Sequence, residues 1–263
     1  RFKAILKVIG IFLTIYSFTM LTPIPVSFYF HDHLVMPFFV GFAVTFIVGL
    51  FLWTSCYKVR SELKIRDGFL VVALFWVVIS TFAALPLWIG DTHHFSFTNA
   101  MFEAVSGFTT TGASGIVDLN ILPKSLLYYR QQLQFLGGMG IVVLAVAILP
   151  MLGIGGMQLY RAETPGPMKE DKMTPRITEV AKNIWLLYLG LVIACCVAYW
   201  LAGMSAFDAL EESFSTISTG GFSIHSGNFA YYHSRLIEMI AVVFMFLGGV
   251  NFSLHYLAIT KTN

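Results

Sequence analysis

Long apolar runs separated by short polar segments dominate this chain, a pattern that predicts a bundle of membrane-spanning helices. A helix that crosses the hydrocarbon core of a bilayer needs about 20 predominantly apolar residues. Runs of roughly that length lie at Ala4–Leu21, Leu34–Ser55, Phe69–Ile89, Leu126–Leu152, Ile184–Leu201 and Leu236–Ile259. We therefore expect an all-α membrane protein with six transmembrane helices.

Two further amphiphilic segments are too short to cross a bilayer. Phe95–Phe108 follows the third run, and Ser205–Ile217 follows the fifth. At about 1.5 Å per residue, each would form a helix of roughly 20 Å. A half-length helix followed by coil leaves backbone groups that lipid cannot satisfy, so it must be enclosed by protein and line a cavity. The pattern predicts two re-entrant pore loops.

Each short segment leads into a polar stretch centred on glycine. The two stretches read Thr109-Thr110-Thr111-Gly112-Ala113-Ser114-Gly115 and Ile217-Ser218-Thr219-Gly220-Gly221-Phe222-Ser223. Gly112 and Gly220 are 108 residues apart, Glu103 and Glu211 share that offset, and Phe-Leu-Gly-Gly recurs downstream at 135–138 and 246–249. We interpret this as an internal repeat in which Gly112 corresponds to Gly220 and Glu103 to Glu211. Repeats of helix, half-helix, loop and helix build ion-selective pores.

Composition excludes a soluble globular protein and several kinds of site. The chain of 263 residues is 57% hydrophobic and 11% charged, with a mean hydropathy of +0.77, which is typical of a multi-span membrane protein. Three cysteines lie in or beside apolar stretches and match neither a disulfide framework nor zinc-ligand spacing. A nucleotide-binding Gly-rich motif and a basic patch for nucleic acid are also missing from the sequence.

The placement of positive charge predicts the orientation. With a cytoplasmic N-terminus, 13 of the 16 Lys and Arg residues face the cytoplasm, and only Lys124, Arg130 and Arg235 lie outside. Cytoplasmic loops carry such an excess. Both half-helices then enter from the outer face, and the long polar stretch Tyr160–Asn183 falls inside.

The two loops have the chemistry of a filter for a dehydrated monovalent cation. Backbone carbonyls coordinate such an ion without holding it too tightly, and glycine lets successive carbonyls point the same way because it adopts positive φ at little cost. The C-terminal dipole of each half-helix adds a favourable potential. The residues expected to line the ion path are Thr110, Thr111, Gly112, Ser218, Thr219 and Gly220, with Thr110, Thr111 and Thr219 as ion ligands. Neither loop carries a carboxylate, which argues against a divalent cation.

Other polar residues are expected to support these loops. Glu103 and Glu211 lie in the half-helices, where a carboxylate is costly and usually paired, and we interpret them as acceptors for loop N–H groups. Ser114, Ser223 and Asn251 complete the predicted supporting set. Arg130 lies at the outer end of a span, and we expect it to snorkel to the interface.

At these residues the chain resembles the Trk/Ktr/HKT superfamily, specifically the bacterial Trk-type potassium uptake membrane subunit. The matching stretches are Phe102–Ser114, Phe135–Pro150, Gly153–Pro167 and Phe214–Phe222. The resemblance implies a K⁺ pore in the bacterial inner membrane, made of four helix–pore loop–helix repeats after an N-terminal helical pair. It implies a homodimer, a cytoplasmic nucleotide-binding regulatory subunit, K⁺ as the transported ion, and no organic cofactor.

The chain matches only the first half of that pattern. We divide it into a helical pair (1–67), a first repeat (68–158), a cytoplasmic connector (159–183) and a second repeat (184–263). Two repeats cannot close a four-sided filter. We expect a fragment, although a second copy or a separate chain could also complete the pore.

Two alternatives remain open at this point. A secondary transporter that couples K⁺ to H⁺ or Na⁺ would also use broken helices, although many such transporters have inverted repeats, whereas both repeats here enter from outside. An intramembrane serine protease would use Ser114 of Gly112-Ala113-Ser114-Gly115 with a histidine from another span. The only histidine in a later apolar span, His255, is expected at the opposite membrane face.

Overall fold

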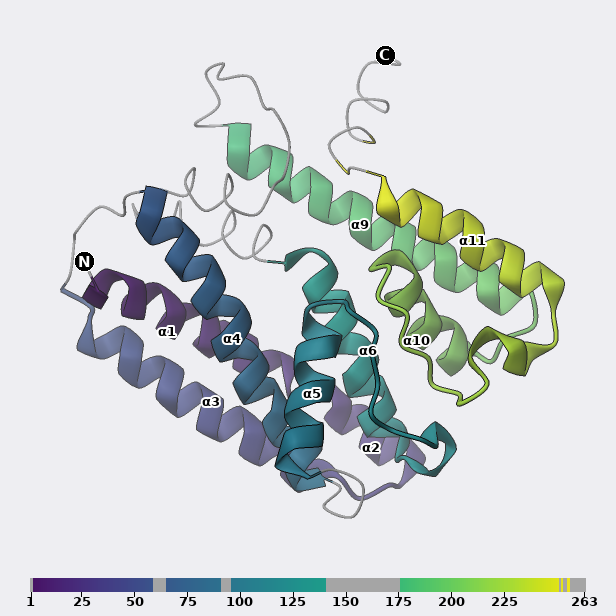
Figure 1. The fold of residues 1–263 in the computed structure, drawn as a ribbon, viewed down its shortest axis with the longest axis horizontal. Helices are drawn as coiled ribbons and strands as arrows, with labels where there is room; N and C mark the ends of the chain where they lie inside the picture. Colours follow the sequence, from purple (N-terminus) through teal and green to yellow (C-terminus); the bar gives the residue numbers. More distant parts are fainter. Residues whose placement is uncertain are drawn as a thin grey trace.

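A computed structural model describes residues 2–58, 65–90, 96–140, 176–250, 252 and 255 of the chain. Within these residues the protein is helical and contains no strand (Figure 1). The helices are α1 (Phe2–Thr19), α2 (Pro23–Phe30), α3 (Val35–Ser55), α4 (Ile65–Gly90), α5 (Phe97–Phe108), α6 (Lys124–Gly138), α9 (Arg176–Leu201), α10 (Ala206–Ile217) and α11 (Arg235–Gly249). Two short 3₁₀ helices, η1 (Leu119–Ile121) and η2 (Asn228–Tyr232), lie in loops.

Four helical stretches in the described part of the chain are long and apolar enough to cross a membrane. They are Phe2–Phe30, Val35–Ser55, Asp67–Gly90 and Lys182–Leu201, and they cover the first, second, third and fifth expected spans. The expected spans Leu126–Leu152 and Leu236–Ile259 begin as α6 and α11, of 15 residues each. Their remaining residues lie largely outside the part that the structure describes.

Helices α1 and α3 approach each other closely because glycines meet at their crossing. A Cβ on Gly10 would lie 2.6 Å from the backbone nitrogen of Trp53, and one on Gly49 would lie 2.7 Å from that of Thr14. Small residues permit such backbone contact between membrane helices. Lys7 Nζ of α1 donates to the carbonyl oxygen of Tyr57 just beyond α3, at 3.2 Å. This pair forms one flank of the molecule.

The buried apolar side chains form two clusters, and α6 lies between them. The first cluster joins α1, α3, α4, α5 and α6, with edge-to-face contact between Phe12 and Phe75 (5.2 Å between ring centres). The second joins α9, α10 and α11. Leu133 of α6 belongs to the first cluster, whereas Phe135 stacks on Phe214 of the second at 4.7 Å. Helix α6 therefore connects the two parts of the fold.

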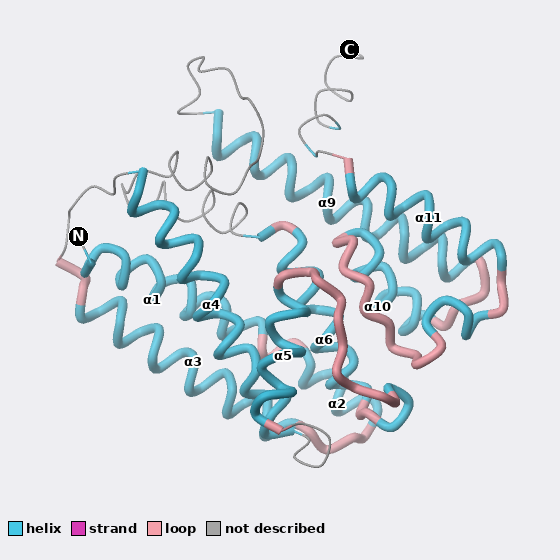
Figure 2. Tube along the Cα trace, in the orientation of Figure 1, coloured by secondary structure: helices cyan, strands magenta, loops and turns pink. Residues whose placement is uncertain are grey.

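The short helices α5 and α10 lie in the middle of the fold on either side of α6 (Figure 1). Each has 12 residues and begins with a serine cap: Ser96 accepts from the N–H of Asn99 and Ser205 from that of Asp208, which satisfies a helix-end donor. The loops that leave their C-terminal ends run between α5 and α10 in this view (Figure 2). Most residues of the first loop are exposed in this chain, whereas residues 222–225 of the second loop are buried. These are the two short helices that the sequence predicts.

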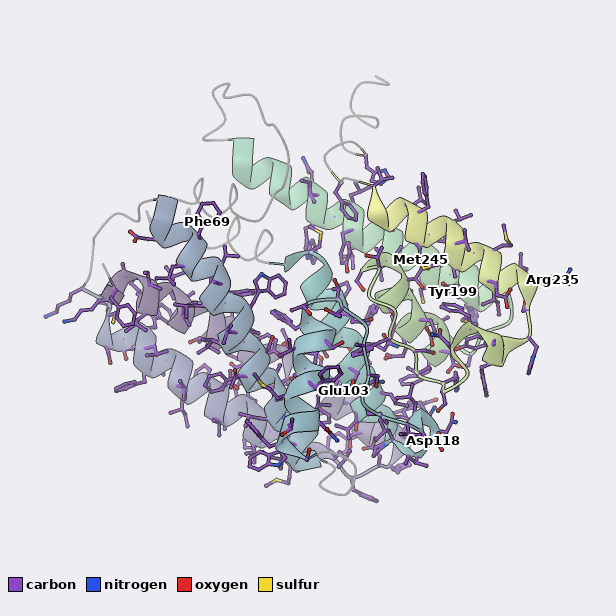
Figure 3. All side chains as sticks on the ribbon, viewed as in Figure 1. Phe69, Glu103, Asp118, Tyr199, Arg235 and Met245 are labelled. Carbon is purple, nitrogen blue, oxygen red and sulfur yellow. The ribbon has the colours of Figure 1, made fainter. Side chains whose placement is uncertain are left out.

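The outer surface of the bundle is apolar, as expected for helices that face lipid. Phe69 of α4 and Met245 of α11 are 57% and 42% exposed. Glu103 is fully buried and lies near the middle of the molecule (Figure 3). Helix α9 begins at Arg176, within the expected connector 159–183, and its candidate membrane span begins at Lys182. The boundaries of the four expected segments remain a prediction.

Candidate filter loops and their support

The two loops after α5 and α10 have the same backbone conformation. Thr110 and Thr219 have φ of 55° and 53°, which is unusual for a β-branched residue. The next residue in each loop donates its N–H back into the helix, Thr111 to Ser106 and Gly220 to Ser215, both at 2.9 Å. Two residues beyond each threonine the backbone again has positive φ. Matching elements are therefore 109 residues apart.

This spacing corrects the alignment inferred from the sequence. Gly112, with φ of 77°, corresponds to Gly221, with φ of 85°, and Gly220 corresponds to Thr111. The pairing of Gly112 with Gly220 is wrong because two adjacent glycines allow the alignment to slip by one residue. The caps Ser96 and Ser205 and the pair Ser114 and Ser223 already carry the spacing of 109, and they were the signal that could have revealed it.

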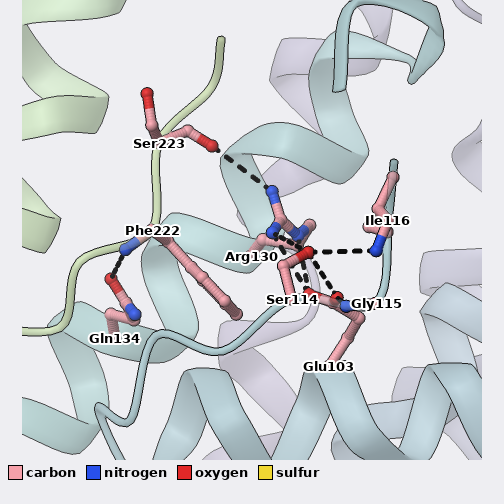
Figure 4. Close-up of polar contacts among 8 residues, drawn as sticks. All are labelled: Glu103, Ser114, Gly115, Ile116, Arg130, Gln134, Phe222 and Ser223. Atoms are coloured by element: carbon pink, nitrogen blue, oxygen red, sulfur yellow. Dashed lines mark hydrogen bonds and ion pairs between the residues drawn. The ribbon is translucent and has the colours of Figure 1, made fainter. Parts of the chain in front are cut away.

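The carboxylates that brace the loops follow the same corrected spacing. Glu103 Oε1 accepts from the Ser114 hydroxyl at 2.6 Å and from the Gly115 N–H at 2.7 Å (Figure 4). In the second repeat Glu212 Oε1 accepts from the Ser223 hydroxyl at 2.6 Å and from the next N–H at 3.1 Å. The assignment of Glu211 to this role is wrong. Glu211 is fully buried, and neither of its carboxylate oxygens has a hydrogen-bond partner among the described residues.

The sequence predicts that Arg130 snorkels to the membrane interface. It is instead fully buried, and its Nε and Nη2 both lie 3.1 Å from Glu103 Oε2. Nη2 also donates to the Ser114 hydroxyl at 3.3 Å, and Nη1 donates to the carbonyl oxygen of Ser223 at 3.4 Å (Figure 4). A buried arginine is stable only when it is paired and hydrogen-bonded. Its single side chain thus contacts both loops.

Gln134, one turn further along α6, is a second supporting residue and was not among those predicted from the sequence. Its Oε1 accepts from the backbone N–H of Phe222 at 3.1 Å (Figure 4). A methyl group on Gly220 would overlap the Gln134 carboxamide. The only sequence signal for this role was the unusually polar run Arg130-Gln131-Gln132 followed by Gln134 within an expected span.

The two loops also touch each other directly. A Cβ on Gly112 would overlap the carbonyl oxygen of Gly220, so the backbones are in contact there. Further along, Asp118 Oδ1 accepts from the Ser226 hydroxyl at 2.9 Å, and Ser226 Oγ accepts from the N–H of Leu119 at 2.8 Å. Hydrogen bonds from Asn120 and Ser226 lower the pKa of the Asp118 carboxyl. These contacts join the repeats at both ends of the loops.

The remaining predicted site residues have mixed environments. The Thr111 hydroxyl lies 2.8 Å from that of Thr109, which itself donates to a helix carbonyl. Ser218 is buried, and its hydroxyl donates to Ser215 O at 3.2 Å, whereas Thr219 is exposed. Asn251 lies outside the described residues.

The contacts of Ser114 do not fit a protease nucleophile. Its hydroxyl donates to Glu103 and accepts from Arg130 and from the N–H of Ile116. His255 Nε2 instead lies 2.9 Å from the carbonyl oxygen of Leu247.

Comparison with known proteins places the chain in a family. Residues 34–263 match the TrkH family, described as cation transport protein. The chain is 52% identical over 258 residues to the Trk system potassium uptake protein TrkH of Vibrio parahaemolyticus, covering 98% of this chain and 53% of that protein. It is 48% identical over 256 residues to TrkH of Escherichia coli K12, covering 97% and 53% of the two chains.

The fold agrees with this result. The crystal structure of the potassium transporter TrkH from Vibrio parahaemolyticus superposes with a TM-score of 0.85 at 47% identity, covering 99% of this chain and 52% of that one. The chain spans about half the length of the curated relatives it matches. Since the family match extends over most of the sequence, the chain belongs to the TrkH family of cation transport proteins.

Proposed function

We propose that this chain forms the first half of a K⁺ uptake pore and that its two polar loops supply two segments of the selectivity filter. The observation that carries this proposal is the pair of loops with one backbone conformation, which touch each other at Gly112 and Gly220. The relatives named above are described as potassium uptake proteins, which supports K⁺ as the transported ion. No organic cofactor is needed for this function.

The corrected alignment changes which carbonyls we assign to the ion path. In the first loop they remain those of Thr110, Thr111 and Gly112. In the second loop the matching residues are Thr219, Gly220 and Gly221 rather than Ser218 to Gly220. Carbonyls on a bent, glycine-containing backbone can replace the hydration shell of K⁺, and positive φ at the glycines turns them in one direction.

The rest of the assembly follows from the same proposal. A missing half or a second chain supplies the other two filter segments, and the complete protein is a homodimer in the bacterial inner membrane with a cytoplasmic N-terminus. A cytoplasmic nucleotide-binding subunit would contact the inner segments 58–67 and 160–182. Most of these two segments lies outside the described residues. The lipid bilayer is the remaining partner.

The experiment that tests the filter assignment substitutes the two glycines of positive φ in the complete pore. A side chain there strains the backbone by about 1–2 kcal/mol and displaces the carbonyls. We expect Gly112→Ser or Gly221→Ser to lower K⁺ over Na⁺ discrimination roughly tenfold, since 1.4 kcal/mol corresponds to a factor of ten. Ion-replacement fluxes in liposomes measure this ratio.

Milder variants and a contrary outcome complete the test. Thr111→Val and Thr219→Val keep the side-chain shape but remove the hydroxyl, so we expect smaller changes if carbonyls dominate. If both glycines only serve tight turns, their variants lose folded protein while the surviving fraction keeps its selectivity. Unaltered selectivity in purified, assembled Gly112→Ser and Gly221→Ser proteins would refute the filter assignment.

A further inference from the structure

Helix α6 reaches the second filter loop with two buried side chains that are one helical turn apart. Arg130 and Gln134 are both fully buried. Arg130 donates to Ser223 O and lies over the Phe222 ring, with its guanidinium carbon 4.3 Å from the ring centre. Gln134 accepts from the N–H of Phe222. The backbone of the second loop is thus held by a helix of the first repeat.

The same arginine is anchored in the first loop. Its contacts with Glu103 and Ser114 are charge-assisted, and such bonds are stronger and more directional than neutral ones. Glu103 in turn holds the N–H of Gly115. A displacement of either loop relative to the other must therefore break contacts of Arg130 in a buried environment, where unpaired polar groups are costly.

The position of Gln134 explains why the second loop has two glycines. Gly220 is not among the glycines with positive φ, so its backbone conformation does not demand glycine. The matching residue of the first loop is Thr111, which carries a side chain at the same backbone geometry. At Gly220 the Gln134 carboxamide occupies the space that a Cβ would need.

Helix α11 has no equivalent of this pair. When the two repeats are aligned on their shared Phe-Leu-Gly-Gly motif, Ala241 is equivalent to Arg130 and Met245 is equivalent to Gln134. Ala241 is buried in the second apolar cluster, and Met245 is exposed. The polar connection is therefore a property of the junction between the first and second loops, and the sequence does not repeat it on α11.

We propose that Arg130 and Gln134 are positioning residues that fix the second filter loop against the first and thereby set the ion selectivity at this junction. This inference rests on the proposed filter function of the loops. The two side chains do not face the ion in this scheme. They act through the carbonyl positions of residues 219–223, in the way that a supporting shell holds a functional site.

The first experiment compares two glutamines of the same helix in the complete pore. Gln134→Met removes the acceptor for Phe222 with little change in volume and introduces the residue found at the matching position of α11. The control is Gln132→Met, because Gln132 is also buried but bonds to Thr19 O and the Thr22 hydroxyl, away from the loops. We expect Gln134→Met to lower the K⁺/Na⁺ flux ratio roughly fivefold (about 1 kcal/mol) and Gln132→Met to leave it unchanged, while both lower the melting temperature.

The second experiment tests the close contact between Gln134 and Gly220 and the contacts of Arg130 with the two loops. We expect Gly220→Ala to impair assembly and the double variant Gln134→Ala/Gly220→Ala to restore it, because the smaller side chain on α6 frees the space. Arg130→Lys keeps a positive charge beside Glu103 but loses the guanidinium N–H group that donates to Ser223 O, so this variant should also lower the K⁺/Na⁺ flux ratio. If the Gln134 variants do not assemble, Arg130→Lys carries the selectivity test.

The possible outcomes separate this inference from the filter assignment. If Gly112→Ser alters selectivity while the assembled Gln134→Met and Arg130→Lys proteins keep the wild-type ratio, the positioning role is wrong and the filter assignment stands. If Gly112→Ser and Gly221→Ser leave the ratio unchanged, the filter assignment itself fails. Equal loss of selectivity in Gln132→Met and Gln134→Met would mean that general loosening of α6 is responsible, which also overturns the inference.

Discussion

At the scale of single residues, the three buried glutamates of the short helices have different environments. Glu103 pairs with Arg130 and holds the first loop. Glu212 holds the second loop through Ser223 and Ile224, and its Oε2 has no hydrogen-bond partner among the described residues. Glu211 bonds to neither loop. The contribution of each carboxylate to stability therefore depends on whether removal of its charge leaves a buried partner unpaired.

We predict a ranked effect for the three conservative variants. Glu103→Gln leaves the Arg130 charge buried without its partner, and breaking a buried pair costs about 3–5 kcal/mol. Glu212→Gln keeps an oxygen acceptor for Ser223 and Ile224, so we expect the free energy of unfolding to fall by only about 1 kcal/mol. Glu211→Gln should leave the flux ratio at its wild-type value. Thermal unfolding in detergent and ion-replacement fluxes give the order, and a larger loss for Glu212→Gln than for Glu103→Gln would contradict it.

At the scale of elements, each short helix ends against a glycine of the helix that follows its loop. A Cβ on Gly137 would overlap the carbonyl oxygen of Phe108, the last residue of α5. A Cβ on Gly248 would likewise overlap the carbonyl oxygen of Ile217, the last residue of α10. Both are the first glycine of Phe-Leu-Gly-Gly. The motif therefore repeats because each half-helix needs the same close backbone contact at its C-terminal end.

This contact predicts the effect of adding one methyl group. Gly137→Ala and Gly248→Ala should lower stability by about 1–3 kcal/mol, the usual cost of forcing extra volume into a packed site. The matched control is Gly249→Ala, because a Cβ there has no neighbour within 4 Å and alanine is the better helix former. The melting temperatures of the purified variants, compared with that of the wild-type protein, measure this loss of stability. Equal values for Gly248→Ala and Gly249→Ala would show that the close contact does not matter.

At the scale of the whole molecule, the two apolar clusters and the central α6 set the two loops side by side. The Lys and Arg asymmetry predicts that the residues joining α5 to α6 face outward and the end of α3 faces the cytoplasm. Asn120 and Lys58 are exposed residues in these two regions. Both half-helices then point their C-terminal ends inward from the outer face, with the negative end of the dipole near the ion path.

Labelling from each side of the membrane tests this orientation. With the three native cysteines replaced, Asn120→Cys should react with a membrane-impermeant reagent added outside, whereas Lys58→Cys should react only after permeabilisation. The opposite pattern would invert the topology and the direction of both pore loops, with no change to the fold itself.

The helices and loops could be predicted from the sequence because they depend on local patterns. Run length separates spanning helices from half-helices, and the Thr/Gly stretches stand out against an apolar background. The repeat was also detectable, but its alignment was wrong by one residue. Adjacent copies of one residue type, Gly220-Gly221 and Glu211-Glu212, have the same local preferences, so composition could not choose between them. The spacing of 109 residues between Ser96 and Ser205 and between Ser114 and Ser223 was the signal in the sequence that favours the second residue of each pair.

The tertiary structure decided which residue of each pair has the geometry that repeats between the two loops. Positive φ identifies Gly221, and hydrogen bonds to the loop identify Glu212. The burial of Arg130 depends on Glu103 and on Ser223, which is 93 residues away along the chain, so hydropathy could only place it at an interface. Sequence by itself predicted the four long apolar helices, the two short helices and the Thr/Gly loops that follow them, because hydropathy and backbone propensity are local. The partners of buried polar groups were decided by packing, because desolvation makes their energy depend on whichever distant groups the fold brings within hydrogen-bond distance.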